Sequence, residues 1–518
     1  MVNNPAPKAC HNCRRRRLKC DRTVPTCQKC HQIGQECLGY GKLFLWNQGV
    51  ASRGRMMGKS YPPSDSPIRD DRVALASGRA SANSSRQDAE MVIPLSPALL
   101  DPLFDGLDAH SRRYLLHFAT HLSSDMIIAD ITDSNPFRNL IPLARDHPIL
   151  RHALVANAAL HLSCLQSRAI NPSTSIGQSA EQAFSSVEHT RPASQALVDA
   201  FSAKQKALVL LRQALADISN IDVNLVVTVV HLFIIFELIG PGEDEWRAHV
   251  QGALRLISYL QTLECNHASP VAAIQDSITS DCLTYYVLGS TLMNTSTLSD
   301  PFLFPGDIIA SLTRAEANSY LSLPTPLLQI LFKACELSNR ITASLTSNST
   351  NHDSLIETAN TLLNATQSFD VISWAKGLEG SSSSRTLSRI HAALAHQNAM
   401  RIYICRSIDQ IHPLGEDTEA LVANIISHVS FVGVDDPIFK ATSWPTFMAG
   451  AETDNPVSRQ WAVDRLHEFW TLIPWGYLKT AEEAIRTTWR LRDESSLQNE
   501  SVSWIQQLKA LERYWLIA

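Results

Sequence analysis

Six cysteines near the start of the chain constrain its local fold more than any other feature. They are Cys10, Cys13, Cys20, Cys27, Cys30 and Cys37. Their spacing is C-x2-C-x6-C, then six residues, then C-x2-C-x6-C again, so the segment contains an internal duplication. A segment of about 30 residues cannot bury enough apolar surface to fold alone. Metal ions or cross-links must therefore hold it together.

Zinc suits this ligand set, because thiolates at C-x2-C spacing form tetrahedral zinc sites. One zinc ion would use four sulfurs and leave two unused, whereas two zinc ions need eight bonds. Six sulfurs supply eight bonds when two of them bridge both metals, and the duplication makes Cys10 and Cys27 the symmetric choice. The terminal ligands would then be Cys13 with Cys20 and Cys30 with Cys37. The sequence predicts two Zn²⁺ ions.

Disulfides are the alternative use of these thiols, but the first residues, MVNNPAPKAC, contain no apolar segment typical of a secretion signal. The longest apolar run, 225–239, is interrupted by His231 and Glu237 and predicts a buried helix, so no membrane partner is expected. We expect the other cysteines to be free thiols in a core. These are Cys164, Cys265, Cys282, Cys335 and Cys405.

Basic residues cluster in the first copy of the repeat. Between its second and third cysteines stand Arg14, Arg15, Arg16, Arg17 and Lys19. Residues 8–38 carry a net charge of +6, which leaves −11 on the rest of a chain whose total is −5. Two zinc ions and six thiolates would still leave the segment near +4. This charge predicts that the segment binds nucleic acid, through a short helix from Arg14 to Lys19 that contacts phosphates and guanine edges.

The spacing together with RRRRLKC resembles the fungal binuclear zinc-cluster transcription factors. The resemblance implies two zinc ions bridged by the first and fourth cysteines, and a helix in the major groove of promoter DNA. It also implies recognition of CGG triplets through a lysine at the position that Arg17 occupies here. Arg16 and Lys19 match further DNA contacts of that family, and Pro25 matches its loop proline.

The remaining sequence predicts a mostly all-α protein with three parts: the cluster over 8–38, a partly disordered linker over 39–100, and a helical regulatory domain over 101–518. An apolar stripe, Leu208, Leu211, Leu215 and Ile218, indicates one helix of this domain. We expect further helices over 106–123, 148–166, 222–239, 244–262, 271–293, 326–346, 384–409, 457–472 and 500–516. Because no heptad pattern is sustained over 38–100, the sequence leaves dimerisation undecided.

Segments of this domain, such as EWRAHVQGALRLISYL, resemble the regulatory region of fungal transcription factors, and CLGYGKLFLWNQGVASRGRMMGK resembles a subgroup that includes regulators of acriflavine sensitivity. The chain shows no catalytic motif, so we expect no enzyme. His117 and His121, four residues apart, are expected to pack rather than bind metal. Trp504 and Trp515 are expected to pack the last helix, although the acidic, tryptophan-containing C-terminal segment could also recruit the transcription machinery.

We therefore expect a nuclear regulator of RNA polymerase II genes that binds double-stranded promoter DNA. The resemblance implies an activator of a metabolic, biosynthetic or detoxification gene set. The transcription machinery and a small-molecule effector are further candidate partners. The alternative is a zinc-scaffolded nuclear interaction protein whose basic tract serves import or non-specific contact with nucleic acid.

Overall fold

The structure is a computed structural model. It describes residues 8–16, 18–24, 26–33, 37, 104, 106–128, 135–170, 191–241, 245–262, 269, 271, 274–293, 305–347, 352–378, 383–498 and 503–518. The chain divides into two compact units, Met1–Ile93 and Pro94–Ala518. The predicted linker over 39–100 lies outside the described residues.

The first unit contains two short helices, α1 (His11–Arg15) and α2 (Gln28–Gln32). Each begins directly after a cysteine, Cys10 or Cys27, whose sulfur accepts a hydrogen bond from the backbone N–H three residues later. This is the geometry of a helix N-cap, with sulfur in place of the usual oxygen. The internal duplication in the sequence is thus a duplication in the structure.

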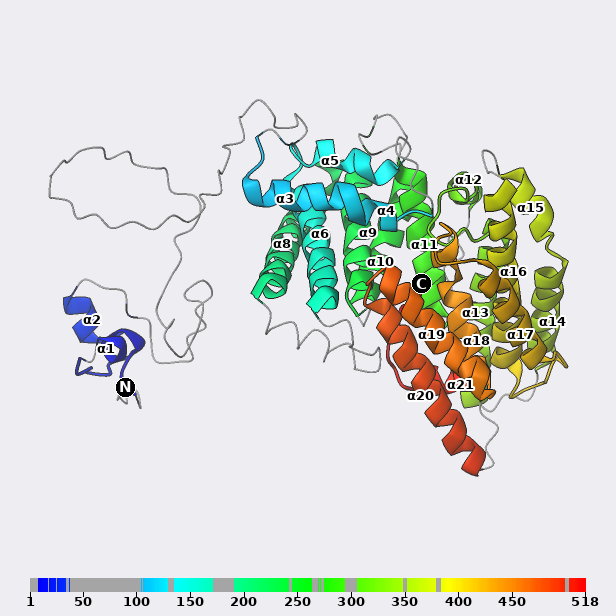
Figure 1. The fold of residues 1–518 in the computed structure, drawn as a ribbon. Helices are drawn as coiled ribbons and strands as arrows, with labels where there is room; N and C mark the ends of the chain where they lie inside the picture. The colour runs from blue at the N-terminus through cyan, green and yellow to red at the C-terminus, as the bar shows by residue number, and fades with distance from the viewer. Residues whose placement is uncertain are drawn as a thin grey trace, which may run out of the picture. The chain divides into compact units, whose positions relative to one another are not determined.

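The described residues of the second unit form helices joined by turns and short irregular segments, and they contain no strand (Figure 1). Its first half contains α3 (Ala109–His117), η3 (Phe118–Leu122), α4 (Ser123–Asp125), η4 (Pro136–Asn139), α5 (Leu140–Leu143), α6 (Pro148–Ile170), α8 (Arg191–Ala216), η6 (Ile218–Asn220), α9 (Val223–Ile239), α10 (Trp246–Thr262), α11 (Gln275–Ser290) and α12 (Gly306–Ala315). Its second half contains α13 (Thr325–Thr346), α14 (Asp353–Ser368), α15 (Val371–Gly377), α16 (Ser383–Ile408), α17 (Thr418–Phe431), η8 (Phe439–Thr442), α18 (Ser443–Glu452), α19 (Pro456–Leu472), α20 (Tyr477–Gln498) and α21 (Trp504–Ala510). The predicted all-α class is confirmed.

Helix α9 lies in the centre of this unit, because its apolar residues surround the whole helix rather than one face. All its residues except Asn224 are buried. Its two ionisable side chains are paired: His231 lies 3.2 Å from Asp281, and Glu237 lies 2.5 Å from the Lys204 ammonium group. Buried charges need such partners, since an unpaired charge in a core is costly. No described helix is long and apolar enough to cross a bilayer.

The predicted C-terminal helix over 500–516 is too long. Helix α21 ends at Ala510, and Glu512 adopts a φ of 53°, which takes the backbone out of the helix. Trp504 is buried within α21, whereas Trp515 is buried beyond it. The Trp246 indole N–H donates to the Tyr514 carbonyl oxygen at 2.5 Å. Both tryptophans thus pack in the core, as expected, but only Trp504 does so from a helix.

The predicted apolar stripe on α8 is only partly a core face. Leu211 is buried, but Leu208 and Leu215 are 36% and 45% exposed, and Ile218 lies beyond the helix in η6. The face of α8 that packs on α6 consists mainly of alanines, including Ala203. Small side chains let two helices approach closely, and alanines therefore provide most of this face, with Leu211 among them. Leu208 and Leu215 lie outside it.

Candidate metal centre and nucleic-acid interface

The six cysteine sulfurs of the first unit form two overlapping groups of four. One group is Cys10, Cys13, Cys20 and Cys27, and the other is Cys10, Cys27, Cys30 and Cys37. Within each group all sulfurs lie within 4.8 Å of one another. The two groups share Cys10 and Cys27, the pair that the sequence symmetry selects as bridging ligands.

The sulfur–sulfur distances fit tetrahedral zinc. The Cys10 sulfur lies 3.6 Å from the Cys27 sulfur and 3.7 Å from the Cys30 sulfur, and the Cys13 and Cys27 sulfurs are 3.8 Å apart. A zinc–sulfur bond of about 2.3 Å in a regular tetrahedron separates the sulfurs by about 3.8 Å. The side chains therefore lie at the separation that zinc requires.

Backbone N–H groups point at the sulfurs in a pattern that repeats in both copies. The Cys13 N–H donates to the Cys10 sulfur at 3.4 Å, and the Cys30 N–H donates to the Cys27 sulfur at 3.3 Å. At the other end of each copy, the N–H groups of Cys10 and Cys27 donate to the sulfurs of Cys20 and Cys37, both at 3.5 Å. Such donors stabilise thiolates, which are the form that binds metal.

Burial opposes this ionisation at the shared cysteines. It raises the pKa of Cys10 to about 12 and that of Cys27 well above the ordinary range. Burial also raises the pKa of Cys20, but hydrogen bonds from the N–H groups of Cys10 and Arg22 outweigh it and bring the pKa to about 7. A buried thiolate pair needs a nearby cation, and a divalent zinc ion supplies that charge. The donor set therefore fits zinc.

Asp21 joins the two copies and was not predicted. Its carboxylate accepts hydrogen bonds from the backbone N–H groups of Gln28 at 2.9 Å and Lys29 at 3.1 Å, at the start of α2. It also accepts one from the Thr23 hydroxyl, and these bonds hold the pKa of Asp21 well below its usual range. The sequence offers no local signal for this role, because the two N–H groups lie seven and eight residues further along the chain.

The predicted helix from Arg14 to Lys19 is wrong. Helix α1 ends at Arg15, and the backbone turns at Arg16, which has φ −89° and ψ 0°. The chain turns because Cys20 must return to the cluster, ten residues after Cys10. Arg14, Arg16 and Lys19 are exposed, so the positive charge lies on the surface. Arg17 and Pro25 lie outside the described residues.

In the second unit, His117, His161 and Asp125 form a row of polar contacts, of which the sequence analysis singled out only His117. His117 lies 3.0 Å from His161, whose other ring nitrogen lies 3.2 Å from Asp125. Burial lowers the pKa of His117 to about 3, so its ring is neutral. Since both nitrogens of His161 have these neighbours, the arrangement is a polar packing chain. The expected packing role of His117 is thus visible, while His121 is exposed and stacks on its ring.

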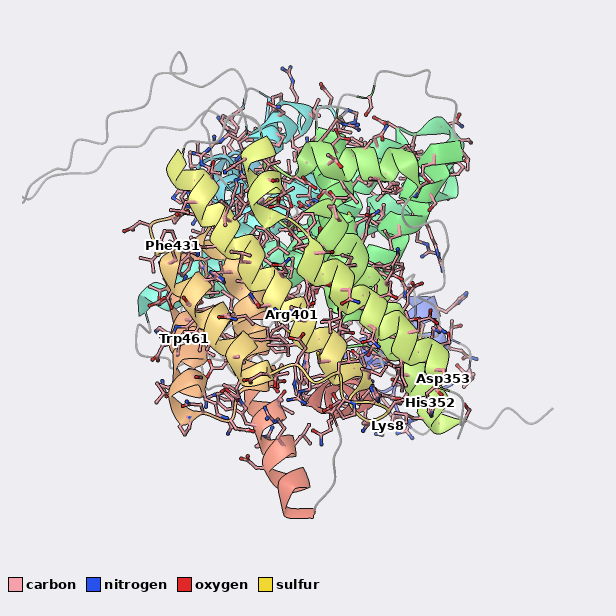
Figure 2. The ribbon with its side chains drawn as sticks, turned by 90° about the vertical axis from the view of Figure 1, so that its right-hand side faces the viewer. Lys8, His352, Asp353, Arg401, Phe431 and Trp461 are labelled. Carbon is pink, nitrogen blue, oxygen red and sulfur yellow. The ribbon has the colours of Figure 1, made fainter. Side chains whose placement is uncertain are left out.

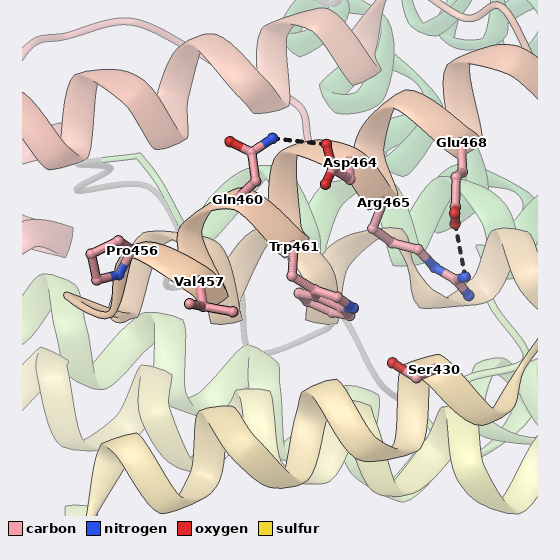
Figure 3. Close-up of a pocket in the computed structure, with 8 residues that line it drawn as sticks. All are labelled: Ser430, Pro456, Val457, Gln460, Trp461, Asp464, Arg465 and Glu468. Atoms are coloured by element: carbon pink, nitrogen blue, oxygen red, sulfur yellow. Dashed lines mark hydrogen bonds and ion pairs between the residues drawn. The ribbon is translucent and has the colours of Figure 1, made fainter.

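The second unit carries a groove of about 740 Å³ between the end of α17 and one side of α19 (Figure 3). It is lined by Ser430, Pro456, Val457, Gln460, Trp461, Asp464, Arg465 and Glu468. The Arg465 side chain, which lines the groove, donates to the Val429 and Val432 carbonyl oxygens at 3.0 and 2.5 Å. Phe431, which is 50% exposed, and Trp461 lie along the same edge of the unit (Figure 2).

The cysteines beyond the cluster behave as expected where the structure describes them. Cys164, Cys282, Cys335 and Cys405 are buried and carry free thiols. Burial raises the pKa of Cys335 to about 12 and that of Cys405 to about 12, so these thiols are protonated and unreactive at neutral pH. Cys265 lies outside the described residues.

Comparison with known proteins identifies both units. Residues 8–46 match the fungal Zn(2)-Cys(6) binuclear cluster domain, and residues 113–517 match the fungal specific transcription factor domain. The acriflavine sensitivity control protein acr-2 of Neurospora crassa is 32% identical over 98% of this chain and 97% of its own length. The Zn(2)-C6 fungal-type transcription factor afumD of Aspergillus fumigatus is 29% identical over 32% of this chain and 34% of its own. No solved structure matches the chain.

The two matches join a metal-binding segment to a regulatory domain in one chain. The cluster domain binds two zinc ions, and the overlapping groups of sulfurs show where the chain has room for them. The second match spans more than half of the 518 residues. The chain belongs to the fungal zinc-cluster transcription factors, which are DNA-binding regulators of transcription.

Proposed function

We propose that this protein is a sequence-specific activator that acts in the nucleus and binds CGG-like triplets in promoter DNA through the surface around α1. Cys10 and Cys27 bridge the two zinc ions, and the other four cysteines each bind one. The observation that carries the proposal is the pair of overlapping sulfur groups with exposed basic residues next to them.

The basic surface meets DNA with two kinds of contact. Arg14, Arg16 and Lys19 surround the end of α1 and are exposed. Lysine and arginine that neutralise phosphates provide affinity that falls with salt, whereas arginine paired with guanine provides sequence preference. Arg17 stands where the family has a lysine, and we assign it the triplet contact. Arg15 completes the basic tract.

The two copies of the repeat have different tasks in this proposal. Copy two replaces the RRRRLK of copy one with HQIGQE, which carries no arginine or lysine. The second copy therefore completes the metal cage, and Asp21 fixes it to the first through the N–H groups of α2. The first copy faces the DNA.

The genes under control are proposed from the Neurospora relative, which is named for control of acriflavine sensitivity and aligns over nearly the whole chain. We assign this protein a detoxification gene set that includes determinants of acriflavine resistance. Deleting the gene should change growth on acriflavine, and transcript profiling of that strain should show lower expression of genes whose promoters contain CGG triplets. Unchanged acriflavine tolerance would contradict this assignment of genes but would leave the proposal of DNA binding as it is.

DNA binding is tested directly with the zinc-loaded full chain and fluorescent duplexes. Affinity should fall steeply between 50 and 200 mM salt and should favour a CGG-containing duplex over a scrambled one. Arg14→Ala, Arg16→Ala or Lys19→Ala should each lower affinity, by about 1–3 kcal/mol where the side chain contacts a base. Lys29→Ala is the matched control, because Lys29 is an exposed cation of α2.

The alternative is a zinc-scaffolded nuclear protein whose basic tract serves import or non-specific contact. It predicts the same salt dependence but equal affinity for the CGG and scrambled duplexes. It also predicts that Lys29→Ala weakens binding as much as Arg16→Ala, because only total charge would matter.

A further inference from the structure

Two histidine rings of the second unit face each other between helices α16 and α17. The Nδ1 atoms of His391, on α16, and His428, on α17, lie 3.0 Å apart. Two neutral imidazole rings can fill such a contact with one N–H···N hydrogen bond, in which one Nδ1 donates and the other accepts. When the shared proton moves to the other ring nitrogen, both Nδ1 atoms offer a lone pair to a metal ion.

Phe431 holds the pair in place. Its ring stacks on His391, with the ring centres 3.9 Å apart and an angle of 16° between the planes. Phe431 follows His428 by three residues, so α17 supplies one histidine and also the aromatic ring that orients the other. Both histidines are partly exposed, and Phe431 lies at the surface of the unit (Figure 2). The pair is therefore ordered in advance and can be reached by an ion from solvent.

The charges around the pair favour a cation. Burial lowers the pKa of both rings, so both are neutral at physiological pH, which is the form that binds metal. His391 also lowers the pKa of His428, whereas no described lysine or arginine contributes at either ring. The Asp436 carboxylate accepts a hydrogen bond from the hydroxyl of Ser388, three residues before His391 on α16. A divalent ion at the pair would thus meet a negative charge nearby and little repulsion.

A second histidine pair shows the opposite case. The Nε2 atom of His117 also lies 3.0 Å from the Nδ1 atom of His161. There, however, His161 is only 2% exposed, and its other nitrogen lies 3.2 Å from Asp125. A hydrated ion cannot reach a ring that is buried to this degree. Of these two pairs, only His391 and His428 combine facing nitrogens with access from solvent.

The distance between the two nitrogens indicates which ion fits. With metal–nitrogen bonds of about 2.0–2.1 Å, two ligands at a right angle lie about 2.9 Å apart, and two at a tetrahedral angle lie about 3.3–3.4 Å apart. The separation of 3.0 Å is closer to the right angle. Tetragonal coordination by nitrogen and oxygen is typical of Cu²⁺ and Ni²⁺, whereas zinc prefers a tetrahedron.

We propose that His391 and His428 together bind one divalent ion of the nickel or copper type through their Nδ1 atoms, with water in the remaining positions. The ion ties α16 to α17 and is distinct from the two zinc ions of the first unit. Because only two side chains hold it, we expect a dissociation constant for Ni²⁺ on the order of 10 micromolar. An ion bound this weakly is lost when the protein is desalted. The site does not depend on DNA binding.

Isothermal titration calorimetry of the zinc-loaded full chain with nickel chloride, without DNA, tests the site. One Ni²⁺ ion per chain should bind, and His391→Gln and His428→Gln should each weaken its binding at least about tenfold. His412→Gln is the matched control, because His412 is exposed beyond the end of α16, and it should leave the constant unchanged. Nickel should also raise the unfolding temperature of the wild-type second unit but not that of the first two variants.

The double variant His391→Gln with His428→Gln measures nickel binding at other side chains, and circular dichroism checks that every variant is folded. Zinc should bind the pair more weakly than nickel does. Nickel binding that is equal in the wild-type protein and the double variant would overturn the proposal, as would the absence of saturable binding up to about 1 mM nickel. Zinc binding as tight as nickel binding would overturn the assignment to a nickel- or copper-type ion.

Discussion

The two units of the chain are stabilised by opposite means. In the first unit the buried cluster consists of Cys10, Cys13, Cys27 and Cys30, with Cys20 and Cys37 packed against it. The second unit buries a large apolar core, in which Trp246, Trp444, Trp475 and Trp515 are among the largest fully buried side chains. A metal bond can therefore replace a hydrophobic core where a segment is too short to form one. The same difference means that the two units should fail under different treatments.

Removal of zinc should separate the two units most clearly. Structural zinc provides about 10–16 kcal/mol of folding free energy in small zinc domains. A strong chelator should therefore unfold the first unit completely, whereas the thermal unfolding of the second unit should not change. Differential scanning calorimetry with and without chelator measures the unfolding temperature of the second unit. Proton NMR of the full chain detects the loss of dispersed signals from the first unit. If the chelator also lowered the unfolding temperature of the second unit, the two units would not be stabilised independently.

A methyl group at Gly476 should damage only the second unit. A Cβ atom there would lie 2.1 Å from the Gly240 carbonyl oxygen, and a backbone atom cannot move aside as a flexible side chain does. Overpacking usually costs 1–3 kcal/mol, and we expect Gly476→Ala to cost about 3 kcal/mol or more. Urea denaturation followed by tryptophan fluorescence provides the measurement.

Gly252→Ala is the matched control for this change, because no atom lies within 4 Å of its Cβ position in α10. Replacing a glycine inside a helix should stabilise the protein by about 1 kcal/mol. Equal effects of the two substitutions would show that close approach at Gly476 does not matter. Neither change should alter the zinc content.

Acid should weaken the second unit through its buried histidines. Burial lowers the pKa of His396 to about 4, whereas an unfolded histidine titrates near 6.5. Between these two pKa values the unfolded chain binds a proton at His396 that the folded chain does not bind. The folded state therefore has its full stability above pH 6.5 and loses the contribution of His396 as the pH falls toward 4. The effect of one such histidine is about 3 kcal/mol at most.

His396→Gln should flatten that pH dependence, since glutamine does not titrate and can still donate to the Ala441 carbonyl oxygen that His396 contacts at 2.8 Å. Urea denaturation at pH 7, 6, 5 and 4 gives the slope. Acid also removes zinc from thiolates, so unfolding must be followed by the fluorescence of tryptophans in the second unit rather than by a signal from the cluster. A slope equal to that of the wild-type protein would contradict the assignment to His396.

The smallest effect is expected at Asp21. Asp21→Asn keeps the size of the side chain but weakens its hold on the N–H groups of Gln28 and Lys29. Mutation of groups that position metal ligands typically weakens metal binding 10- to 100-fold. Because the Asp21 carboxylate is exposed, we expect Asp21→Asn to weaken zinc binding about tenfold. Competition with a chromogenic chelator measures the zinc affinity, and the unfolding temperature of the second unit should not change.

The sequence predicted the two units unequally well, for physical reasons. Cysteine spacing determines which sulfurs meet, so the duplication alone was enough to predict that Cys10 and Cys27 would belong to both sulfur groups. Helix α1, however, ends at Arg15 rather than Lys19, because the return of Cys20 to the cluster overrides the helix propensity of arginine and lysine. The role of Asp21 was missed because it depends on a contact with the other copy.

In the second unit, periodicity located the central helices closely. The predicted helix over 222–239 is α9 (Val223–Ile239), and that over 457–472 is α19 (Pro456–Leu472). Periodicity could not tell which face of α8 is buried, because Leu208 and Leu215 form an apolar pattern on the outside while alanines form the packing face. A hydrophobic stripe in a sequence therefore does not by itself identify the buried face of a helix.

The metal content of the full chain tests the central claim most directly. Native mass spectrometry of the zinc-loaded protein, followed by alkylation of accessible thiols, should find two zinc ions per chain and no label on any of the six cluster cysteines. A single zinc ion with two labelled cysteines, or disulfides among the six, would contradict a centre in which Cys10 and Cys27 are shared between two metals.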